Sequence, residues 1–495
     1  MNNASATENT REIYRRVDPE YKHKLHELHN GDTLRFCYQC GACTASCPLS
    51  QLIRVYRPNK ILELAKLGIR NIPQSNAFVF CSACTQCTKG CPQGVRVHEI
   101  MHALKDLAIH DQDAIDYIAD GFEDALDTLA VEIPFPVSYS WISLSPPDNN
   151  ETDGFYGPAR EALLSYLKRL KREAAPQKEG APAVAVIGSG PAGLTAAMEL
   201  RKAGYPVTVF EPLPEAGGML MVGIPSYRLP KDIVAAEVDG IKSMGVEIRT
   251  NTPADKALFE KLLNDGEYKA VFIATGAPMA RGLRIDGEAL EGVVTALDFL
   301  RGFNLNEGSE TGKNVVVVGG GNVGIDAART ALRCGAETVR LFCLESRAEM
   351  PSHEWEILEA AAEGVVIEPS FGPKEILGEN GRVTGVEFIR CKSVFGADGR
   401  FDPVYDEKTT QTVEADMVIT AIGQAPDTGF LQQMIDITRG AITVDPLTME
   451  TSLDGVFAGG DTVSGTASLI EAIVAGRTAA SSIIRHLEKQ TAPAG

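Results

Sequence analysis

The second part of the chain alternates apolar runs, glycine-rich turns and stretches with helical character. An apolar run begins at Val184, meets a turn with three glycines and continues into an Ala- and Leu-rich stretch. A second apolar run then ends on an acid, Glu211. The order strand, turn, helix, strand predicts a βαβ unit of a parallel sheet. The glycines of the turn are Gly188, Gly190 and Gly193.

This glycine spacing suits the binding of a dinucleotide. The first glycine permits a tight turn, the second lets the backbone approach a pyrophosphate, and the third lets helix and strand pack closely. The N-terminus of the helix would offer N–H groups and a positive dipole to the phosphates. Glu211 would accept hydrogen bonds from a ribose. A plain glycine-rich turn is the alternative, and we disfavour it because strand, helix and terminal acid all stand where dinucleotide binding needs them.

The same pattern recurs from Asn314, with an apolar run, three glycines and a helical stretch that starts at Asn322. The second set of glycines is Gly319, Gly321 and Gly324. Two such units predict an α/β protein with two dinucleotide sites. Farther along, an apolar strand finishes on Asp461, and residues 467–486 read as a helix whose N-terminus could face a cofactor.

Eight of the eleven cysteines precede residue 92 and form two identical runs of the form C-x2-C-x2-C-x3-C-P. This is the spacing of two-cluster ferredoxins, in which three close thiolates hold one [4Fe-4S] cluster and the fourth reaches across to the other. Zinc knuckles are the alternative, and two complete four-cysteine runs disfavour them. The expected ligand sets are Cys37, Cys40, Cys43 and Cys91 for one cluster, and Cys81, Cys84, Cys87 and Cys47 for the second.

Composition narrows the class of protein further. The chain has 495 residues, 44% hydrophobic and 23% charged, which predicts a globular protein of several domains. The net charge of −19 argues against binding to nucleic acid or to an anionic membrane. The N-terminus lacks the apolar core of a signal peptide, and no apolar run approaches the roughly 18 residues that span a bilayer. We therefore expect a cytoplasmic protein whose cysteines bind metal rather than form disulfides.

The cysteine runs, CYQCGACTASCP and CSACTQCTKGCPQGV, resemble the small iron–sulfur subunit of heterodisulfide reductases. They are also similar to the electron-transfer subunit of anaerobic glycerol-3-phosphate dehydrogenases. The resemblance covers roughly the first 110 residues. With apolar helical patterns at Ile61–Ala65 and Val97–Ile109, it implies a small helical domain that holds two clusters.

The two glycine fingerprints and the strand that ends at Asp461 resemble the flavin disulfide-reductase superfamily, in which the second nucleotide domain is inserted into the first. The likeness is strongest to the small subunit of bacterial glutamate synthase and to the flavoprotein subunits of electron-bifurcating transhydrogenases. The resemblance implies FAD on Gly188, Gly190, Gly193, Glu211, Gly218 and Asp461. It implies a nicotinamide dinucleotide on Gly319, Gly321, Asn322, Gly324 and Glu345.

The same resemblance gives a map of the domains. A helical two-cluster domain would occupy residues 1–125, and a connector residues 126–180. The FAD-binding domain would comprise residues 181–297 and 414–491, with the nicotinamide domain inserted at 298–413.

The strand after the second fingerprint bears on the choice between NAD(H) and NADP(H). In NADPH-using relatives, the positions of Leu344 and Glu345, counted back from Met350-Pro351, are commonly two arginines that clamp the 2'-phosphate. A carboxylate at the second position can hydrogen-bond a free 2'-hydroxyl and would repel a phosphate. We therefore expect NAD(H) rather than NADP(H), although Arg347 lies close enough to complicate the argument.

No cysteine lies between Ala174 and Leu300, so the dithiol that disulfide reductases place beside the flavin is absent. We expect NADH to pass a hydride to FAD, and the clusters to relay single electrons to or from a catalytic or ferredoxin-like partner in a hetero-oligomeric complex. The partner class would be a 2-oxoacid, aldehyde or acyl-CoA oxidoreductase. The rival functions are the NADPH-linked small subunit of glutamate synthase and a non-enzymatic electron-wire subunit.

Overall fold

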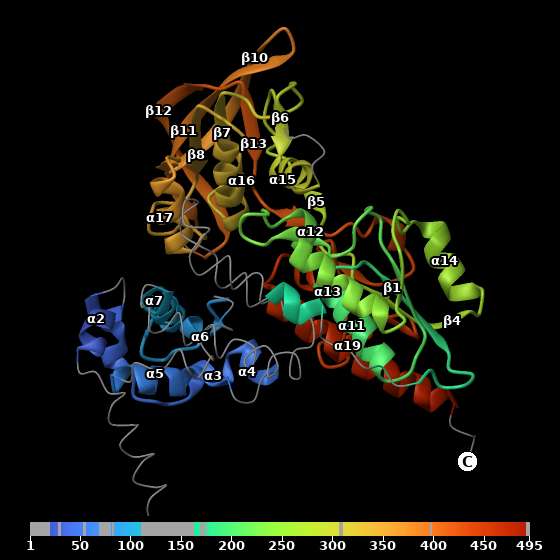
Figure 1. Ribbon diagram of the computed structural model, residues 1–495. Coiled ribbons are helices and arrows are strands. Elements are labelled where there is room, and N and C mark those ends of the chain that lie inside the picture. Colours follow the sequence, from blue (N-terminus) through green and yellow to red (C-terminus); the bar gives the residue numbers. More distant parts are fainter. Residues whose placement is uncertain are drawn as a thin grey trace, which may run out of the picture.

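The computed structural model describes residues 20–27, 31–52, 56–68, 81, 84–109, 163–168, 174, 176–305, 310–396 and 398–491 (Figure 1). Most of the connector expected at 126–180 lies outside these residues. The part of it that is described includes a helical segment at 163–168, in which Leu163 and Leu167 are buried. None of the helices in the described ranges has both the length and the apolar character needed to cross a bilayer.

The N-terminal unit is helical, as the cysteine spacing and apolar pattern predict (Figure 1). Its core is formed by apolar side chains that these short helices turn inward, among them Leu34, Leu62 and Met101. Its elements are α2 (Tyr21–Glu27), η1 (Gly31–Phe36), α3 (Ala42–Ala45), α4 (Pro48–Leu52), α5 (Pro58–Lys66), α6 (Gln86–Lys89) and α7 (Val97–Ile109).

A parallel five-stranded sheet follows, in the order β17-β4-β1-β2-β3. Its first strand is almost wholly apolar and its last four residues are buried, as expected for a parallel strand covered on both faces. The strands are β1 (Ala183–Ile187), β2 (Val207–Phe210), β3 (Glu247–Arg249), β4 (Tyr268–Ile273) and β17 (Val456–Ala458). The helices are α11 (Pro191–Lys202), α12 (Met219–Val222), α13 (Lys231–Ser243), α14 (Lys256–Asn264), α18 (Asp461–Ser464) and α19 (Leu469–Thr491).

Between β4 and β17 the chain builds a second five-stranded parallel sheet, in the order β6-β13-β7-β8-β9. Its strands are β6 (Val293–Thr295), β7 (Asn314–Val318), β8 (Thr338–Cys343), β9 (Val366–Pro369) and β13 (Met417–Thr420), and its helices are α15 (Ala296–Asn304), α16 (Asn322–Arg333) and α17 (Glu354–Ala362). An antiparallel sheet of β10 (Phe371–Glu379), β11 (Arg382–Phe395) and β12 (Phe401–Glu414) extends it.

The fold is therefore α/β, with one Rossmann-like unit inserted into another and a helical unit before both. Where the chain passes between the two sheets, β5 (Met279–Ala280) pairs antiparallel with β14 (Gln424–Ala425). The outgoing and returning segments thus run side by side. A further two-stranded ribbon, β15 (Ile437–Thr438) with β16 (Ala441–Ile442), and the turn η4 (Gly429–Leu431) precede β17.

The helical unit contacts both Rossmann-like units (Figure 1). Helix α4 packs against α19, and the Gln86 amide nitrogen donates to a carboxylate oxygen of Glu471 at 3.3 Å. On the other side, His98 and His102 of α7 contact Trp355 of α17, with ring centroids 6.2 and 4.3 Å apart. The helical unit is therefore packed against the C-terminal helix of the first sheet and against a helix of the inserted unit.

Candidate cofactor sites

The turn after β1 can only be built from glycines at two of its three positions. Gly188 has φ +102°, and a Cβ there would lie 2.4 Å from the Ala274 carbonyl oxygen at the end of the neighbouring strand. A Cβ at Gly193 would lie 2.0 Å from the Gly188 carbonyl oxygen. Gly190 differs, because a Cβ there would meet no atom within 4 Å. The open face at Gly190 is where the expected pyrophosphate would approach the backbone.

Glu211 lies at the end of β2 and is buried, with 3% of its surface exposed. One carboxylate oxygen accepts a hydrogen bond from the Ser189 backbone N–H at 3.0 Å, and also from the Ser189 hydroxyl. The other accepts from the Leu213 backbone N–H at 2.9 Å. The Ser189 hydroxyl in turn accepts from the Gly217 backbone N–H at 3.0 Å. The Glu211 carboxylate therefore stabilises the glycine turn, in addition to any contact with a ribose. The sequence did not indicate this stabilising role.

Gly218 and Asp461 reach the same turn from distant parts of the chain. Gly218 has φ +56°, and a Cβ there would lie 2.7 Å from the Gly190 Cα. Asp461 begins α18, and its carboxylate accepts from the Ala467 backbone N–H at 3.3 Å. Burial raises the pKa of Asp461 to about 6. Gly460 packs against α11, since a Cβ there would lie 3.0 Å from the Ala192 Cβ.

The turn after β7 repeats the geometry of the first. Gly319 has φ +131°, and a Cβ there would lie 2.3 Å from the Ala421 carbonyl oxygen at the end of β13. A Cβ at Gly324 would lie 2.1 Å from the Gly319 carbonyl oxygen, whereas one at Gly321 would meet nothing within 4 Å. Asn322, the first residue of α16, has a buried side-chain oxygen with no hydrogen-bond partner among the described residues. In both turns, the first and third glycines pack closely against backbone atoms, whereas the middle glycine has free space beside it.

Glu345 follows β8, the strand next to β7, and is partly buried. Arg347 lies two residues on, and its guanidinium makes two hydrogen bonds to the Glu354 carboxylate, at 2.7 and 2.9 Å. The positive charge of Arg347 is thus matched by Glu354 at the start of α17. Glu345 makes no side-chain ion pair among those found in the described residues.

The eight N-terminal cysteines surround two cavities. One, the Cys37 cavity, is lined by Cys37, Cys40, Cys43 and Cys91, together with Tyr38, Asn59 and Leu62. The other, the Cys47 cavity, is lined by Cys47, Cys81, Cys84 and Cys87, together with Leu49, Tyr56 and His98. Each cavity therefore takes three thiols from one run and the last thiol from the other run.

The two cysteine runs adopt related backbone conformations. Gly41 caps α3 with φ +82°, and Thr85 caps α6 with φ +63°. The runs also pack against each other, because a Cβ at Gly90 would lie 2.2 Å from the Ser46 hydroxyl. Burial raises the pKa of the Cys43 thiol to about 11 and raises that of Cys87 as well. No three His, Cys, Asp or Glu side chains in the described ranges converge tightly enough for one metal ion.

Models of known protein families match both the N-terminal helical unit and the two Rossmann-like units. The model of the pyridine nucleotide-disulphide oxidoreductase family matches residues 182–479. This chain belongs to that family. The model of the 4Fe-4S dicluster domain matches residues 36–96. The chain is an oxidoreductase that combines a flavin- and nicotinamide-binding fold with an iron–sulfur domain.

Among curated proteins, the chain is 47% identical over 314 residues to the NADP(+)-dependent formate dehydrogenase subunit beta of Moorella thermoacetica, covering 62% of this chain and 44% of that protein. It is 40% identical over 336 residues to the NADPH-Fe(3+) oxidoreductase subunit beta of Geobacter sulfurreducens, and the match covers 62% of this chain and 50% of that protein. It is 37% identical over 326 residues to the glutamate synthase [NADPH] small chain of Azospirillum brasilense, and the match covers 62% of this chain and 67% of that protein. The chain thus matches about half the length of the first two relatives.

Among solved structures, Mycobacterium tuberculosis FprA in complex with NADPH matches with a TM-score of 0.52 and 19% identity, covering 62% of this chain and 85% of that one. The likeness concerns the fold of the two Rossmann-like units.

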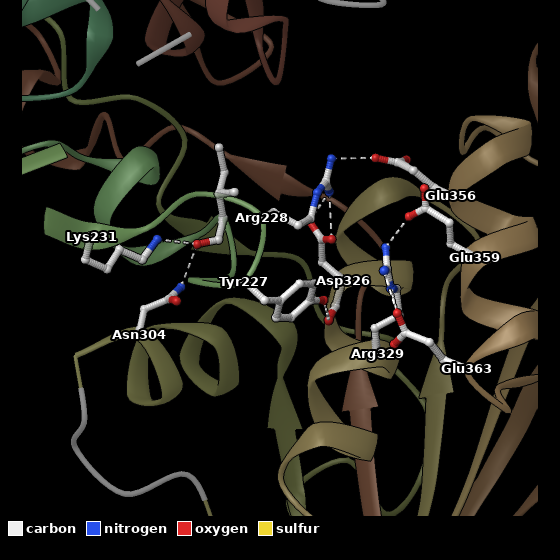
Figure 2. Close-up of polar contacts among 10 residues, drawn as sticks. Tyr227, Arg228, Lys231, Asn304, Asp326, Arg329, Glu356, Glu359 and Glu363 are labelled. Carbon is white, nitrogen blue, oxygen red and sulfur yellow. Dashed lines mark hydrogen bonds and ion pairs between the residues drawn. The ribbon is translucent and has the colours of Figure 1, made fainter. Parts of the chain in front are cut away.

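In this member of the pyridine nucleotide-disulphide oxidoreductase family, a buried ion-pair network joins the two Rossmann-like units (Figure 2). Arg228, in the loop before α13, donates to both oxygens of Asp326 in α16 at 2.7 and 2.8 Å. Its other terminal nitrogen donates to Glu356 in α17 at 2.7 Å. Burial raises the pKa of Asp326, while Arg228 opposes that shift. We call the three side chains Arg228, Asp326 and Glu356 the inter-unit ion triad.

The surroundings hold the loop of Arg228 in place (Figure 2). Lys231 donates to the carbonyl oxygens of Leu220, at 3.0 Å, and of Ile224. Asn304, at the end of α15, donates to the Val222 and Ile224 carbonyl oxygens at 2.9 and 3.0 Å. Burial lowers the pKa of Lys231 to about 7.

Behind the triad, Arg329 of α16 donates to Glu359 at 2.7 Å and to Glu363, both in α17 (Figure 2). These partners belong to the inserted unit alone, so Arg329 ties two of its helices together. The sequence pattern gave no sign that Asp326 would pair with Arg228. The signal was available in the run IPSYRLPK, where a charged residue stands between apolar ones before a helix.

Proposed function

We propose that the chain is a subunit of a complex that transfers electrons between a nicotinamide dinucleotide and a partner protein, through FAD and two [4Fe-4S] clusters. The observation that carries the proposal is the division of eight cysteines between two cavities, each with a fourth thiol from the other run. That division is the ligand exchange of two-cluster ferredoxins. The two open glycine turns lie in the same chain.

For FAD, we assign the turn of Gly188, Gly190 and Gly193, with Glu211, Gly218 and Asp461. The fit rests on the open face at Gly190 and on the convergence of Gly218 with that turn. Backbone N–H groups at the start of α11 would bind the pyrophosphate, and Asp461 would bind the sugar-alcohol chain. Asp461 begins a helix, so the same region also offers backbone donors.

For the clusters, we assign Cys37, Cys40, Cys43 and Cys91 to one and Cys47, Cys81, Cys84 and Cys87 to the other. Buried thiols with raised pKa values become thiolates when they bind iron, because the metal charge outweighs the cost of burial. When bound, the flavin supplies exchange between a hydride and single electrons, and the clusters supply single-electron transfer. Because β6 and β13 belong to the second sheet and Glu291 bridges to Arg382, we propose an inserted nicotinamide unit of residues 291–420 in place of 298–413.

For the nicotinamide dinucleotide, we assign Gly319, Gly321, Gly324, Asn322 and Glu345. The buried side-chain oxygen of Asn322 has no partner among the described residues, which fits a group that receives a hydrogen bond from a ligand. We propose NAD(H) as the preferred form. Glu345 would accept from the ribose 2'-hydroxyl, and the charge of Arg347 is already matched by Glu354. Against this, the three relatives above carry NADP(+) or NADPH in their names.

Substitution at Glu345 tests the nicotinamide assignment. Glu345→Arg should raise kcat/KM for NADPH by about tenfold and lower that for NADH, because the phosphate gains a cation in place of an anion. Glu291→Arg, in the same unit but paired with Arg382 on the surface, is the control. An NADPH preference of about tenfold in the unmodified protein would overturn the NAD(H) proposal.

The names of the relatives above support a proposal about the kind of complex that the chain joins. Two are beta subunits and one is a small chain, so we propose a hetero-oligomer in which a second subunit carries the terminal reaction. A 2-oxoacid, aldehyde or acyl-CoA oxidoreductase, or a formate dehydrogenase such as the Moorella relative serves, would suit low-potential electrons. The second candidate is a glutamate synthase small chain, favoured by the 67% of the Azospirillum protein that is covered.

Anaerobic titration of the purified protein with NADH, followed by optical and EPR spectra, tests the proposed function. Bleaching of the flavin followed by signals of reduced clusters would support the relay. Protein that binds no FAD, or that holds zinc in place of iron after anaerobic reconstitution, would refute it. Oxidation of NADPH that depends on 2-oxoglutarate and glutamine, with a glutamate synthase large subunit added, would favour the second candidate.

A further inference from the structure

The Cys47 cavity is covered by other parts of the molecule. Leu49 in its wall belongs to α4, which packs against α19 of the first Rossmann-like unit. His98, also in the wall, contacts His353 and Trp355 of the inserted unit, with ring centroids 6.1 and 6.2 Å away. Both Rossmann-like units therefore help to keep water from this cavity.

The lining of the Cys47 cavity is mostly closed to solvent. Tyr56 and Met101 are 1% and 0% exposed, and the cysteines Cys47 and Cys87 are each 7% exposed. The Ser50 hydroxyl lies beside Cys47, but burial has the larger effect on that thiol and raises its pKa. Such a wall disfavours added negative charge, because water and hydrogen-bond donors are what stabilise a charge.

The Cys37 cavity is more polar and more open. Cys40 and Gln93 in its wall are both exposed, and Asn59 adds a second amide to the wall. The Lys66 ammonium donates to the Cys37 carbonyl oxygen at 2.9 Å, so a positive charge stands next to the first cysteine. Water, amide groups and a cation all stabilise negative charge placed beside them.

Gln39 reaches a cysteine sulfur of the Cys37 cavity. Its amide nitrogen donates to the Cys37 sulfur at 3.4 Å. Its backbone has φ +63°, in the left-handed region that residues other than glycine seldom adopt. Conformations of this kind persist where the surroundings hold them, and they cluster at functional sites. Ala83 stands at the corresponding position of the second cysteine run, so that run has no side-chain amide there.

An amide that donates to a cysteine sulfur affects the reduction potential of the cluster which that sulfur would hold. Reduction adds one negative charge to a cluster and its thiolates. A donated hydrogen bond, a nearby cation and contact with water stabilise the added charge, so each of them raises the potential. A dry, apolar wall has the opposite effect. The two cavities therefore differ in the direction that favours an electron at the Cys37 cavity.

We propose that Gln39 raises the reduction potential of the cluster held at the Cys37 cavity above that of the cluster held at the Cys47 cavity. The proposal rests on the proposed function and adds the order of the two potentials and the residue that sets it. A single electron shared by the clusters then rests at the Cys37 cavity. That cluster is reduced by one electron as the other is oxidised by one, and no atom is transferred. The pair carried by one NADH, which leaves as NAD⁺ and a proton, suffices to reduce both.

The test measures both midpoint potentials in the full chain after anaerobic reconstitution. Dithionite and redox mediators set the potential, and EPR records the reduced clusters at each step. In the unmodified protein we expect two separate potentials. Gln39→Leu should lower the upper potential and leave the lower one unchanged. The equilibrium constant for electron exchange between the clusters should fall by about tenfold, or about 59 mV for one electron, because a hydrogen bond to a charged sulfur is lost.

A second variant and a control separate the amide from the backbone. Gln39→Gly also removes the amide, but glycine suits φ +63° better than glutamine does. This variant should therefore keep the fold and lower the upper potential by the same factor. Gln86→Leu is the matched control, because Gln86 precedes Cys87 but its amide nitrogen donates to a Glu471 carboxylate oxygen at 3.3 Å. The control should change the exchange constant by less than about twofold.

The outcomes distinguish the order of the potentials from the proposed function. Equal potentials in the unmodified protein would overturn the proposal, and so would Gln39 variants that move the lower potential, move neither, or match Gln86→Leu. NADH is absent from this titration, so the titration decides the order of the potentials even for protein that NADH fails to reduce. Failure of NADH to reduce the protein would count against the proposed function alone, whereas protein that assembles no clusters would overturn both.

Discussion

Replacing Arg228 with methionine tests the inter-unit ion triad. Arg228, Asp326 and Glu356 have side chains 16%, 10% and 3% exposed, so the variant leaves two buried carboxylates without the guanidinium that bonds them. Removing one partner of a buried ion pair costs about 3–5 kcal/mol. If that cost falls on the contact between the two Rossmann-like units, the equilibrium constant for the docked arrangement falls by a factor of about 10² to 5 × 10³.

The assay combines hydrogen exchange with rapid mixing. In the Arg228→Met variant, we expect faster exchange in residues 223–230 and in the first turns of α16. We also expect flavin reduction by NADH to slow by about tenfold or more, while the dissociation constant of NADH changes little, since the nucleotide contacts that we propose lie within the inserted unit. Arg340→Met, which removes an ion pair with Glu368 inside that unit, is the control and should leave both unchanged. Unchanged exchange and an unchanged rate of flavin reduction in the Arg228→Met variant would refute the reasoning.

Two further predictions concern the flavin turn and a buried histidine. Gly190→Ala should fold normally and lose FAD affinity by about tenfold or more, because its Cβ meets no protein atom within 4 Å. Gly188→Ala should destabilise the fold, because its Cβ collides with the Ala274 carbonyl oxygen. Equal loss of folding in the two variants would contradict this prediction. Burial lowers the pKa of His353 to about 4, and its ring stacks on Trp355 at 4.2 Å. The His102 ring also lies 4.3 Å from Trp355, so the assay uses a Trp141→Phe, His102→Gln background. In that background, Trp355 fluorescence should stay constant from pH 8 to about 5 and be quenched below it. Since the unfolded chain binds this proton near the ordinary value of about 6.5, the folded state should also lose stability as pH falls from about 6.5 toward 4. A quenching step near pH 6.5 would show that His353 titrates normally.

The sequence predicted those parts of the fold whose causes are local. The turns of Gly188 and Gly319 follow from spacing, because a positive φ and a close approach to the next strand leave glycine as the residue that fits. Helices α5 and α7 follow from apolar periodicity. The antiparallel sheet of β10, β11 and β12 was not predicted, since its strands alternate weakly and face solvent over much of their length.

The long-range contacts were beyond the reach of the sequence for a different reason. Ser189 bonds Glu211 across a separation of 22 residues, and Arg228 bonds Asp326 across 98. The residues around Arg228 and those around Asp326 do not indicate that these two side chains pair, because the pairing depends on how the two sheets are placed relative to each other. The spacing of the cysteines did indicate which thiols share a cavity, since that exchange is built into the repeated run.

The first sheet is completed by β17, which pairs with β4 although nearly two hundred residues separate them in the chain. During synthesis on the ribosome, the strands of the second sheet emerge as one uninterrupted block. The first sheet is complete only after its edge strand β17 and Asp461 have also emerged. The inserted unit can thus form before the unit that encloses it. Loading of the flavin would then be a late step of biogenesis, and a ribosome stalled before β17 would carry a folded nicotinamide unit beside an incomplete flavin unit.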